Sequence, residues 1–225
     1  MLKKYVPYII ILLIAPVIIL AGAFLFPQKS YVAISFLLAT LACVPFFISF
    51  ENKNATTKRI VIIAVMTALS VAGRFIFAPI AFFKPITALV IITAVYLGKD
   101  AGFLTGALSA FISNFYFGQG PWTPFQMFAW GIIGFIAGIL SNHILRYKVV
   151  MIIYAVLSGV LYSFILDIWS TMWIDGSLSL TRFIATTATS LPITAVYAIS
   201  NVIFLFLLLK PIGKKLERIK TKYGL

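Results

Sequence analysis

Eight apolar stretches, almost free of Lys, Arg, Asp and Glu, make up most of this 225-residue chain. A helix needs roughly 20 apolar residues to cross a bilayer, and only helices or closed barrels satisfy their backbone groups there. Barrel strands would alternate apolar and polar residues, whereas these stretches are apolar on all sides. With 62% hydrophobic and 10% charged residues, the chain is predicted to be all-α, a polytopic membrane bundle of about eight transmembrane helices. The predicted spans are residues 5–26, 31–50, 58–78, 86–98, 101–117, 125–145, 149–170 and 184–209.

Basic residues are distributed unevenly between the two sides of the predicted bundle. When alternate loops are assigned to opposite sides, fourteen Lys and Arg residues fall on one side and four on the other. The positive-inside rule places the richer side in the cytoplasm. We therefore predict a multi-pass plasma-membrane protein with both termini in the cytoplasm. The four residues on the outer side are Lys29, Arg74, Lys84 and Arg182.

The densest basic run, from Lys210 to Lys222, directly follows the last predicted span. This position argues against a nucleic-acid partner. It favours orientation of the chain and attraction to the anionic headgroups of the lipid bilayer, with docking of a cytoplasmic partner as the alternative.

Residues for catalysis or metal binding are scarce. The chain has one cysteine, Cys43, one histidine, His143, and five acidic residues, which rules out a disulfide framework. It contains no G-x-x-x-x-G-K-[ST] loop for ATP. We predict no catalytic residues, no metal and no cofactor, so energy for uphill transport must come from a partner or an ion. Stretch 5–26 lacks a small-x-small cleavage site and is predicted to be a retained span rather than a signal peptide.

Small residues recur at helical spacing in three spans. Ala64, Ala68 and Ala72 form one shallow stripe, and such stripes let another helix approach closely in a membrane. Spacing alone leaves open whether this stripe packs inside the chain or docks on a partner. Two glycine-containing stripes in adjacent spans are predicted to pack together: Gly102, Gly106 and Ala110, and Gly131, Gly134 and Gly138.

Two predicted outer loops, 77–85 and 114–126, are rich in aromatic residues, Pro and Gly. Aromatic residues at a membrane surface commonly form a belt. A belt does not explain the prolines and glycines around Trp122, with Asn114 and Gln126 on either side. Rigid loops with rings and neutral hydrogen-bonding groups suit an uncharged or weakly charged ligand that contains rings.

Three charged residues, Arg74, Lys84 and Asp167, are predicted to lie at or inside the outer half of the bundle. Embedded charges are expensive and normally face a cavity or a partner. Arg74 and Asp167 come late in their spans, at comparable depth. They either pair with each other or contact a ligand through charge-assisted hydrogen bonds.

The stretch from Arg59 to Ile139 resembles the substrate-binding S component of energy-coupling factor (ECF) vitamin transporters. The resemblance rests on AVMTALSVAGRF, on Phe-Lys-Pro, on Leu-Gly-x-x-x-Gly-Phe and on Gly-x-Gly-Pro-Trp-Thr-Pro-x-Gln-Met. It implies a six-helix core over residues 57–212, preceded by two additional helices in residues 1–56 and followed by a basic cytoplasmic tail, 213–225.

The same resemblance implies a division of labour. S components bind a vitamin on the outer side and associate with a transmembrane scaffold subunit and two ATPase subunits. The family's Ala-x-x-x-Ala docking motif matches Ala64 and Ala68, and Ala72 continues it. Separate ATPase subunits also fit the missing phosphate-binding loop.

The pattern looks closest to cobalamin-type members, and the ligand is expected to be cobalamin or another corrinoid. Riboflavin or a queuosine-type base is the alternative. Ring contacts are expected from Phe82 and Trp122, and hydrogen bonds from Asn114 and Gln126. The complete set of predicted ligand-binding residues is Arg74, Phe82, Lys84, Asn114, Tyr116, Trp122, Gln126, Trp130 and Asp167.

Two other classes of protein fit these residues less well. A stand-alone secondary transporter would need embedded ion-coupling groups, for which only Asp167 qualifies, and it would show inverted repeats. A membrane enzyme would need a nucleophile and a base close together, but His143 is predicted on the side opposite the polar loops.

Overall fold

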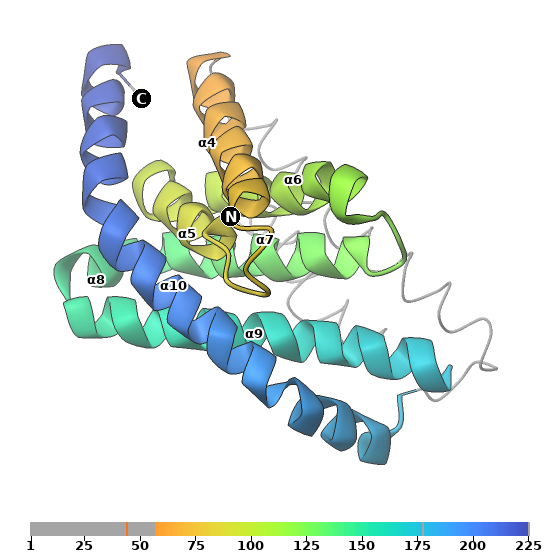
Figure 1. Cartoon of the computed structure of the whole chain (residues 1–225). Helices are drawn as coiled ribbons and strands as arrows, with labels where there is room; N and C mark the ends of the chain where they lie inside the picture. Colours follow the sequence, from red (N-terminus) through yellow and green to blue (C-terminus); the bar gives the residue numbers. More distant parts are fainter. Residues whose placement is uncertain (1–43, 45–56, 177, 225) are drawn as a thin grey trace, which may run out of the picture.

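The computed structural model describes Val44 and residues 57–176 and 178–224. Within these residues the chain forms seven α-helices and no strand, which confirms the predicted helical membrane bundle (Figure 1). Predicted spans 5–26 and 31–50 lie outside the described residues. The helices are α4 (Thr57–Ile76), α5 (Ile86–Leu97), α6 (Lys99–Phe117), α7 (Thr123–Ile139), α8 (Ser141–Arg146), α9 (Lys148–Asp175) and α10 (Leu180–Tyr223).

Two of the helix boundaries differ most from the prediction. The predicted span 125–145 ends as α7 at Ile139, and the chain turns at Leu140 into the six-residue α8. The last predicted span ends at residue 209, whereas helix α10 continues through the basic run to Tyr223. Lys and Arg are good helix formers, so loss of hydrophobicity ends a membrane span without ending a helix.

Helix α10 also contains Pro192 and Pro211. Proline removes a backbone hydrogen bond and commonly kinks a helix. Figure 1 shows α10 crossing α9 and then changing direction before its dark-blue C-terminal part. At its start, the Ser179 side chain accepts a hydrogen bond from the backbone N–H of Arg182, as an N-cap residue does.

Helices α4, α9 and α10 are long and apolar enough to cross a membrane, whereas α5 and α7 are shorter. The 12 residues of α5 extend roughly 18 Å at 1.5 Å per residue, well short of the hydrocarbon thickness. Nearly every residue of α5 is buried, which is expected of a helix that is apolar on all sides. This short central helix leaves room at its N-terminal end for the loop formed by residues 77–85.

Helices α6 and α7 pack with their backbones in close contact. A Cβ added to Gly106 would lie 2.4 Å from the Trp130 carbonyl oxygen, and one added to Gly134 would lie 2.4 Å from the Gly102 carbonyl oxygen. No side chain fits in these spaces. The two predicted glycine stripes therefore do pack against each other, as small residues permit in membranes.

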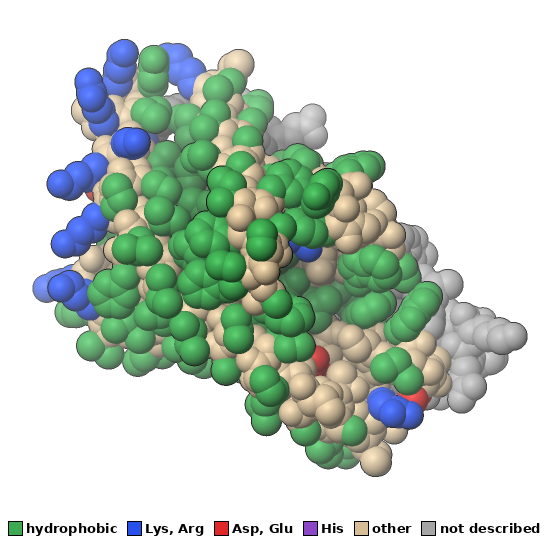
Figure 2. Space-filling model, viewed as in Figure 1, with side chains coloured by type: hydrophobic (Ala, Val, Ile, Leu, Met, Phe, Trp, Pro, Cys, Tyr) green, Lys and Arg blue, Asp and Glu red, His purple; other side chains and the backbone are tan. Residues whose placement is uncertain are grey.

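One end of the bundle, called here the basic end, collects the start of α4, the end of α5 and the end of α10. Arg59 Nη2 donates to the Leu97 carbonyl oxygen at 2.8 Å, and Lys220 Nζ donates to the Tyr96 carbonyl oxygen at 3.0 Å. Figure 2 shows Lys and Arg side chains gathered at the upper left, while apolar side chains cover much of the rest of the visible face.

Candidate functional site

The loop 77–85 lies at the opposite end from these basic residues and is held by Lys84. The Lys84 ammonium donates hydrogen bonds to the carbonyl oxygens of Phe77, of Ala78 at 3.2 Å and of Ile80 at 2.8 Å. Ser200 Oγ of α10 donates to the Lys84 carbonyl oxygen at 2.9 Å. These bonds fold the loop back on itself and tie it to α10.

Phe82, at the tip of this loop, has a φ of 59°. A non-glycine residue in the left-handed region carries a cost of roughly 1–3 kcal/mol, and such residues gather at ligand sites. The side chain of Phe82 is 42% exposed, so burial of its own ring does not offset this cost.

Beneath the loop lies a cavity of about 320 Å³. Helix α4, the loop and the first turn of α5 form one side of it. The residues that line this side are Arg74, Ala78, Phe82, Lys84, Ile86 and Thr87. The other side is formed by α6, α7, α9 and α10, through Phe117, Gln126, Trp130, Tyr162, Tyr197 and Asn201.

The aromatic rings of the cavity form a connected series. Trp130 stacks on Tyr162 with ring centroids 4.8 Å apart and planes 24° from parallel. Tyr162 meets Tyr197 edge-on at 5.0 Å, and Tyr197 meets Phe82 edge-on at 5.8 Å. Trp130 Nε1 donates to Thr87 Oγ1 at 3.2 Å. Each ring is therefore held by a neighbour, and the rings present a pre-formed aromatic wall.

Arg74 is held at the cavity by neutral oxygens and by rings. Its Nη1 donates to Ser113 Oγ and, at 2.8 Å, to Asn114 Oδ1. Its guanidinium carbon lies 4.4 Å from the Phe117 ring centroid and 5.4 Å from that of Trp130. A guanidinium has five N–H donors, so these contacts fix its position without using all of its donors.

Asn114 connects Arg74 to α7. Its Nδ2 donates to Thr123 Oγ1 at 2.9 Å and to Gln126 Oε1 at 2.8 Å. Because Asn114 is buried and does not line the cavity, it orients Arg74 and Gln126 from behind.

The cavity has a positive electrostatic character. Its lining includes Arg74 and Lys84 and, among the described residues, no Asp or Glu. Burial lowers the pKa of the Lys84 ammonium, and the nearby charge of Arg74 lowers it further. A cationic ligand would meet the same repulsion.

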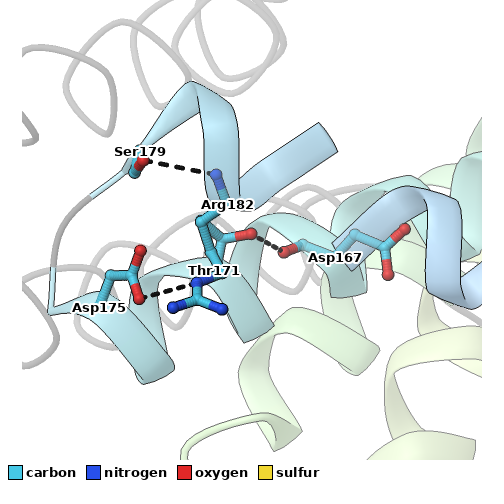
Figure 3. A network of polar contacts seen from close by, with 5 residues as sticks. All are labelled: Asp167, Thr171, Asp175, Ser179 and Arg182. Carbon is cyan, nitrogen blue, oxygen red and sulfur yellow. Dashed lines mark hydrogen bonds and ion pairs between the residues drawn. The ribbon is translucent and has the colours of Figure 1, made fainter. Parts of the chain in front are cut away.

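The structure separates Arg74 from Asp167. Asp167 Oδ2 accepts a hydrogen bond from Ser190 Oγ at 2.7 Å, and in the described part of the chain the two charged groups form no ion pair. A different acidic residue, Asp175, forms an ion pair, with its Oδ1 2.9 Å from Arg182 Nε. Figure 3 shows the Asp167 carboxylate pointing away from that pair. The expected alternative of an Arg74–Asp167 lock is therefore wrong.

Two aromatic residues of the predicted ligand-binding set lie outside the cavity lining. Trp122 packs edge-on against Trp169, with ring centroids 5.8 Å apart. A Cβ on Gly120 would lie 2.3 Å from the Trp122 ring, so glycine there serves the packing of the tryptophan. Tyr116 is 74% exposed and packs against Phe75.

Five predicted residues do meet at the cavity: Arg74, Phe82, Lys84, Gln126 and Trp130. Sequence reasoning missed Tyr162, Tyr197 and Asn201, which lie within apolar spans. The amide of Asn201 inside an apolar run was a usable signal, because embedded polar groups mark functional positions. The two tyrosines carried no such signal, since aromatic residues are common on lipid-facing surfaces.

The alanine stripe of α4 faces outward. Ala64, Ala68 and Ala72 are all exposed, and they line a shallow groove of about 390 Å³ together with Leu108 and Ile112 of α6. Of the two interpretations left open by spacing, packing inside the chain does not hold for the described residues.

Residues 54–214 match the family model described as "ECF-type riboflavin transporter, S component". This match covers more than half of the chain and includes every helix from α4 to α9 and most of α10. Comparisons with curated proteins and with solved structures gave no match.

Proposed function

The chain belongs to the family of S components of ECF-type riboflavin transporters, and from this premise we propose that its cavity binds riboflavin or a close analogue. Members of this family are substrate-binding transport subunits rather than enzymes. The observation that carries the proposal is the cavity of aromatic rings, amides and two cations beneath loop 77–85. Riboflavin combines a flat tricyclic ring, carbonyl and imide edges and a hydroxylated chain.

The aromatic wall supports a flat ring. The Phe82 and Tyr197 rings border the cavity, and rings of a ligand gain from stacked or edge-on contact with such side chains. Gln126 and Asn201 each carry an amide, which both donates and accepts hydrogen bonds. These amides match the alternating donors and acceptors of an imide edge, and Arg74 can donate to a carbonyl oxygen.

The size of the cavity favours riboflavin over cobalamin. At about 320 Å³ it lies at the lower end of the roughly 300–1,000 Å³ typical of sites for drug-sized ligands. A corrinoid is several times larger than such ligands. We therefore propose riboflavin in place of the cobalamin expected from the sequence pattern, with a queuosine-type base as the alternative of similar size.

The charge of the cavity supports the same choice. Riboflavin is neutral and rich in hydrogen-bond acceptors, so Arg74 and Lys84 do not repel it. A vitamin with a permanent positive charge, such as thiamine, would be disfavoured by both cations.

The topology supports an outward-facing site. The cavity lies at the opposite end of the bundle from the Lys and Arg cluster, and the positive-inside rule assigns that cluster to the cytoplasm. Both described ends of the core, Thr57 and Gly224, lie on the basic side. We propose that the ligand enters from outside the cell.

Transport then requires partners. The exposed Ala64, Ala68 and Ala72 stripe is proposed to dock on a transmembrane scaffold subunit, because alanines let a helix approach closely. Two ATPase subunits would supply the energy, since this chain has no phosphate-binding loop.

Uptake into vesicles tests this proposal. We expect vesicles that contain the chain, a scaffold and ATPase subunits to accumulate riboflavin only when ATP is present on the ATPase side. Vesicles with the chain alone should bind riboflavin without accumulating it. Uptake by the chain alone, driven by an ion gradient at the rate of the full complex, would contradict the proposal and support a secondary transporter.

A further inference from the structure

A second groove lies at the basic end, between the first half of α4 and the last turns of α10. Its volume is about 440 Å³, and apolar side chains form most of its walls. Val61 and Val65 of α4 are more than half exposed along it, while Leu216 of α10 is buried at its base. None of the described residues that line it is acidic.

Two lysines flank the end of this groove. Tyr223 and Lys58 line it, and the Lys58 Nζ lies 5.3 Å from the centroid of the Tyr223 ring. The Nζ of Lys222 lies 5.4 Å from the same centroid. Both lysines are exposed, so this end of the groove presents two accessible positive charges beside one ring.

This arrangement selects for an amphiphile with a negative headgroup. Hydrogen-bonding side chains occur only at the Thr57, Lys58 and Tyr223 end of the groove. A peptide strand or loop lying along the apolar walls would leave its backbone groups without partners, which is expensive in a membrane. A hydrocarbon chain has no such groups and fills the apolar part without this cost.

We propose that the groove binds one anionic phospholipid. Its phosphate lies between Lys58 and Lys222, and an acyl chain runs along Val61 and Val65 toward the middle of the bundle. Because each lysine near a membrane surface favours anionic lipid by a similar increment, the pair distinguishes a phosphatidylglycerol headgroup from a zwitterionic one.

Retention of lipid by the purified full-length chain tests this site. The protein in detergent is mixed with phosphatidylglycerol and phosphatidylcholine that carry the same acyl chains, and bound lipid is counted by native mass spectrometry. We expect one retained phosphatidylglycerol per chain. The double variant Lys58→Gln/Lys222→Gln should weaken this retention roughly ten- to thirtyfold.

Two further variants distinguish lipid binding in the groove from non-specific attraction of anionic lipid to the basic residues. Lys214→Gln/Lys215→Gln removes two positive charges as well, both from α10 and both outside the groove, and should retain lipid like wild type. Val65→Trp should fill the groove and expel the lipid although both lysines remain. Inorganic phosphate should not displace it.

Several results would overturn the proposal. These are equal retention of the two lipids, equal loss in the two lysine pairs, full retention in Val65→Trp, and displacement by inorganic phosphate. None of them bears on riboflavin binding, so the lipid site and the proposed function fail independently.

Discussion

Vesicles that carry the Ala68→Leu variant with scaffold and ATPase subunits should lose at least roughly tenfold in riboflavin uptake, while riboflavin affinity stays at the wild-type value. Ala68 is exposed at the centre of the α4 stripe and lines the shallow groove beside Leu108. A leucine there holds the partner helix away, and close packing is the main attraction between helices in a membrane. A loss of about 1.4 kcal/mol in docking corresponds to tenfold.

A matched substitution distinguishes a loss of docking from a general effect of a bulky residue on an exposed helix surface. Ala185 is also an exposed alanine on a membrane helix, α10, and Ala185→Leu should leave uptake unchanged. If Ala68→Leu weakens riboflavin binding as much as it weakens uptake, the stripe supports the fold of the cavity and the docking assignment is wrong.

Phe82→Ala should weaken riboflavin binding by roughly tenfold to a hundredfold, because a buried aromatic contact is worth about 1–3 kcal/mol. The ring lines the cavity and meets Tyr197 edge-on at 5.8 Å. It is 42% exposed and lies on a loop, so its removal should leave thermal stability almost unchanged. Direct titration of the purified variant, beside a melting curve, measures both.

Phe115→Ala is the control for this variant. Phe115 is 72% exposed on α6 and packs against Phe111 rather than on the cavity. Its removal should change neither affinity nor melting temperature. Wild-type affinity in Phe82→Ala would show that the loop ring does not touch the ligand.

The helices of the described core could be predicted because membrane spans need uninterrupted hydrophobicity, which is a local property of the sequence. The break at Leu140 and the extension of α10 to Tyr223 could not be predicted from hydrophobicity. Hydropathy marks where the bilayer begins, whereas helix ends depend on turns and on the helix propensity of polar residues.

Residues of the candidate site could be predicted only where they lie in a distinctive loop or carry a charge within an apolar span. Arg74, Phe82 and Gln126 were found in that way, and they line the cavity. Trp122 stood out in the sequence but packs on Trp169. Tyr162 lines the cavity from inside a span. The direction in which a ring points from an apolar helix depends on tertiary packing, which no local pattern encodes.

The cavity beneath loop 77–85 is proposed to select a flat, neutral, tricyclic vitamin. Titration of the purified chain with riboflavin, followed by quenching of flavin fluorescence, tests it most directly, with thiamine and cobalamin in parallel. We predict saturable binding of one riboflavin per chain, weakened in Phe82→Ala, and no binding of thiamine or cobalamin. Saturable binding of cobalamin with none of riboflavin would contradict the account.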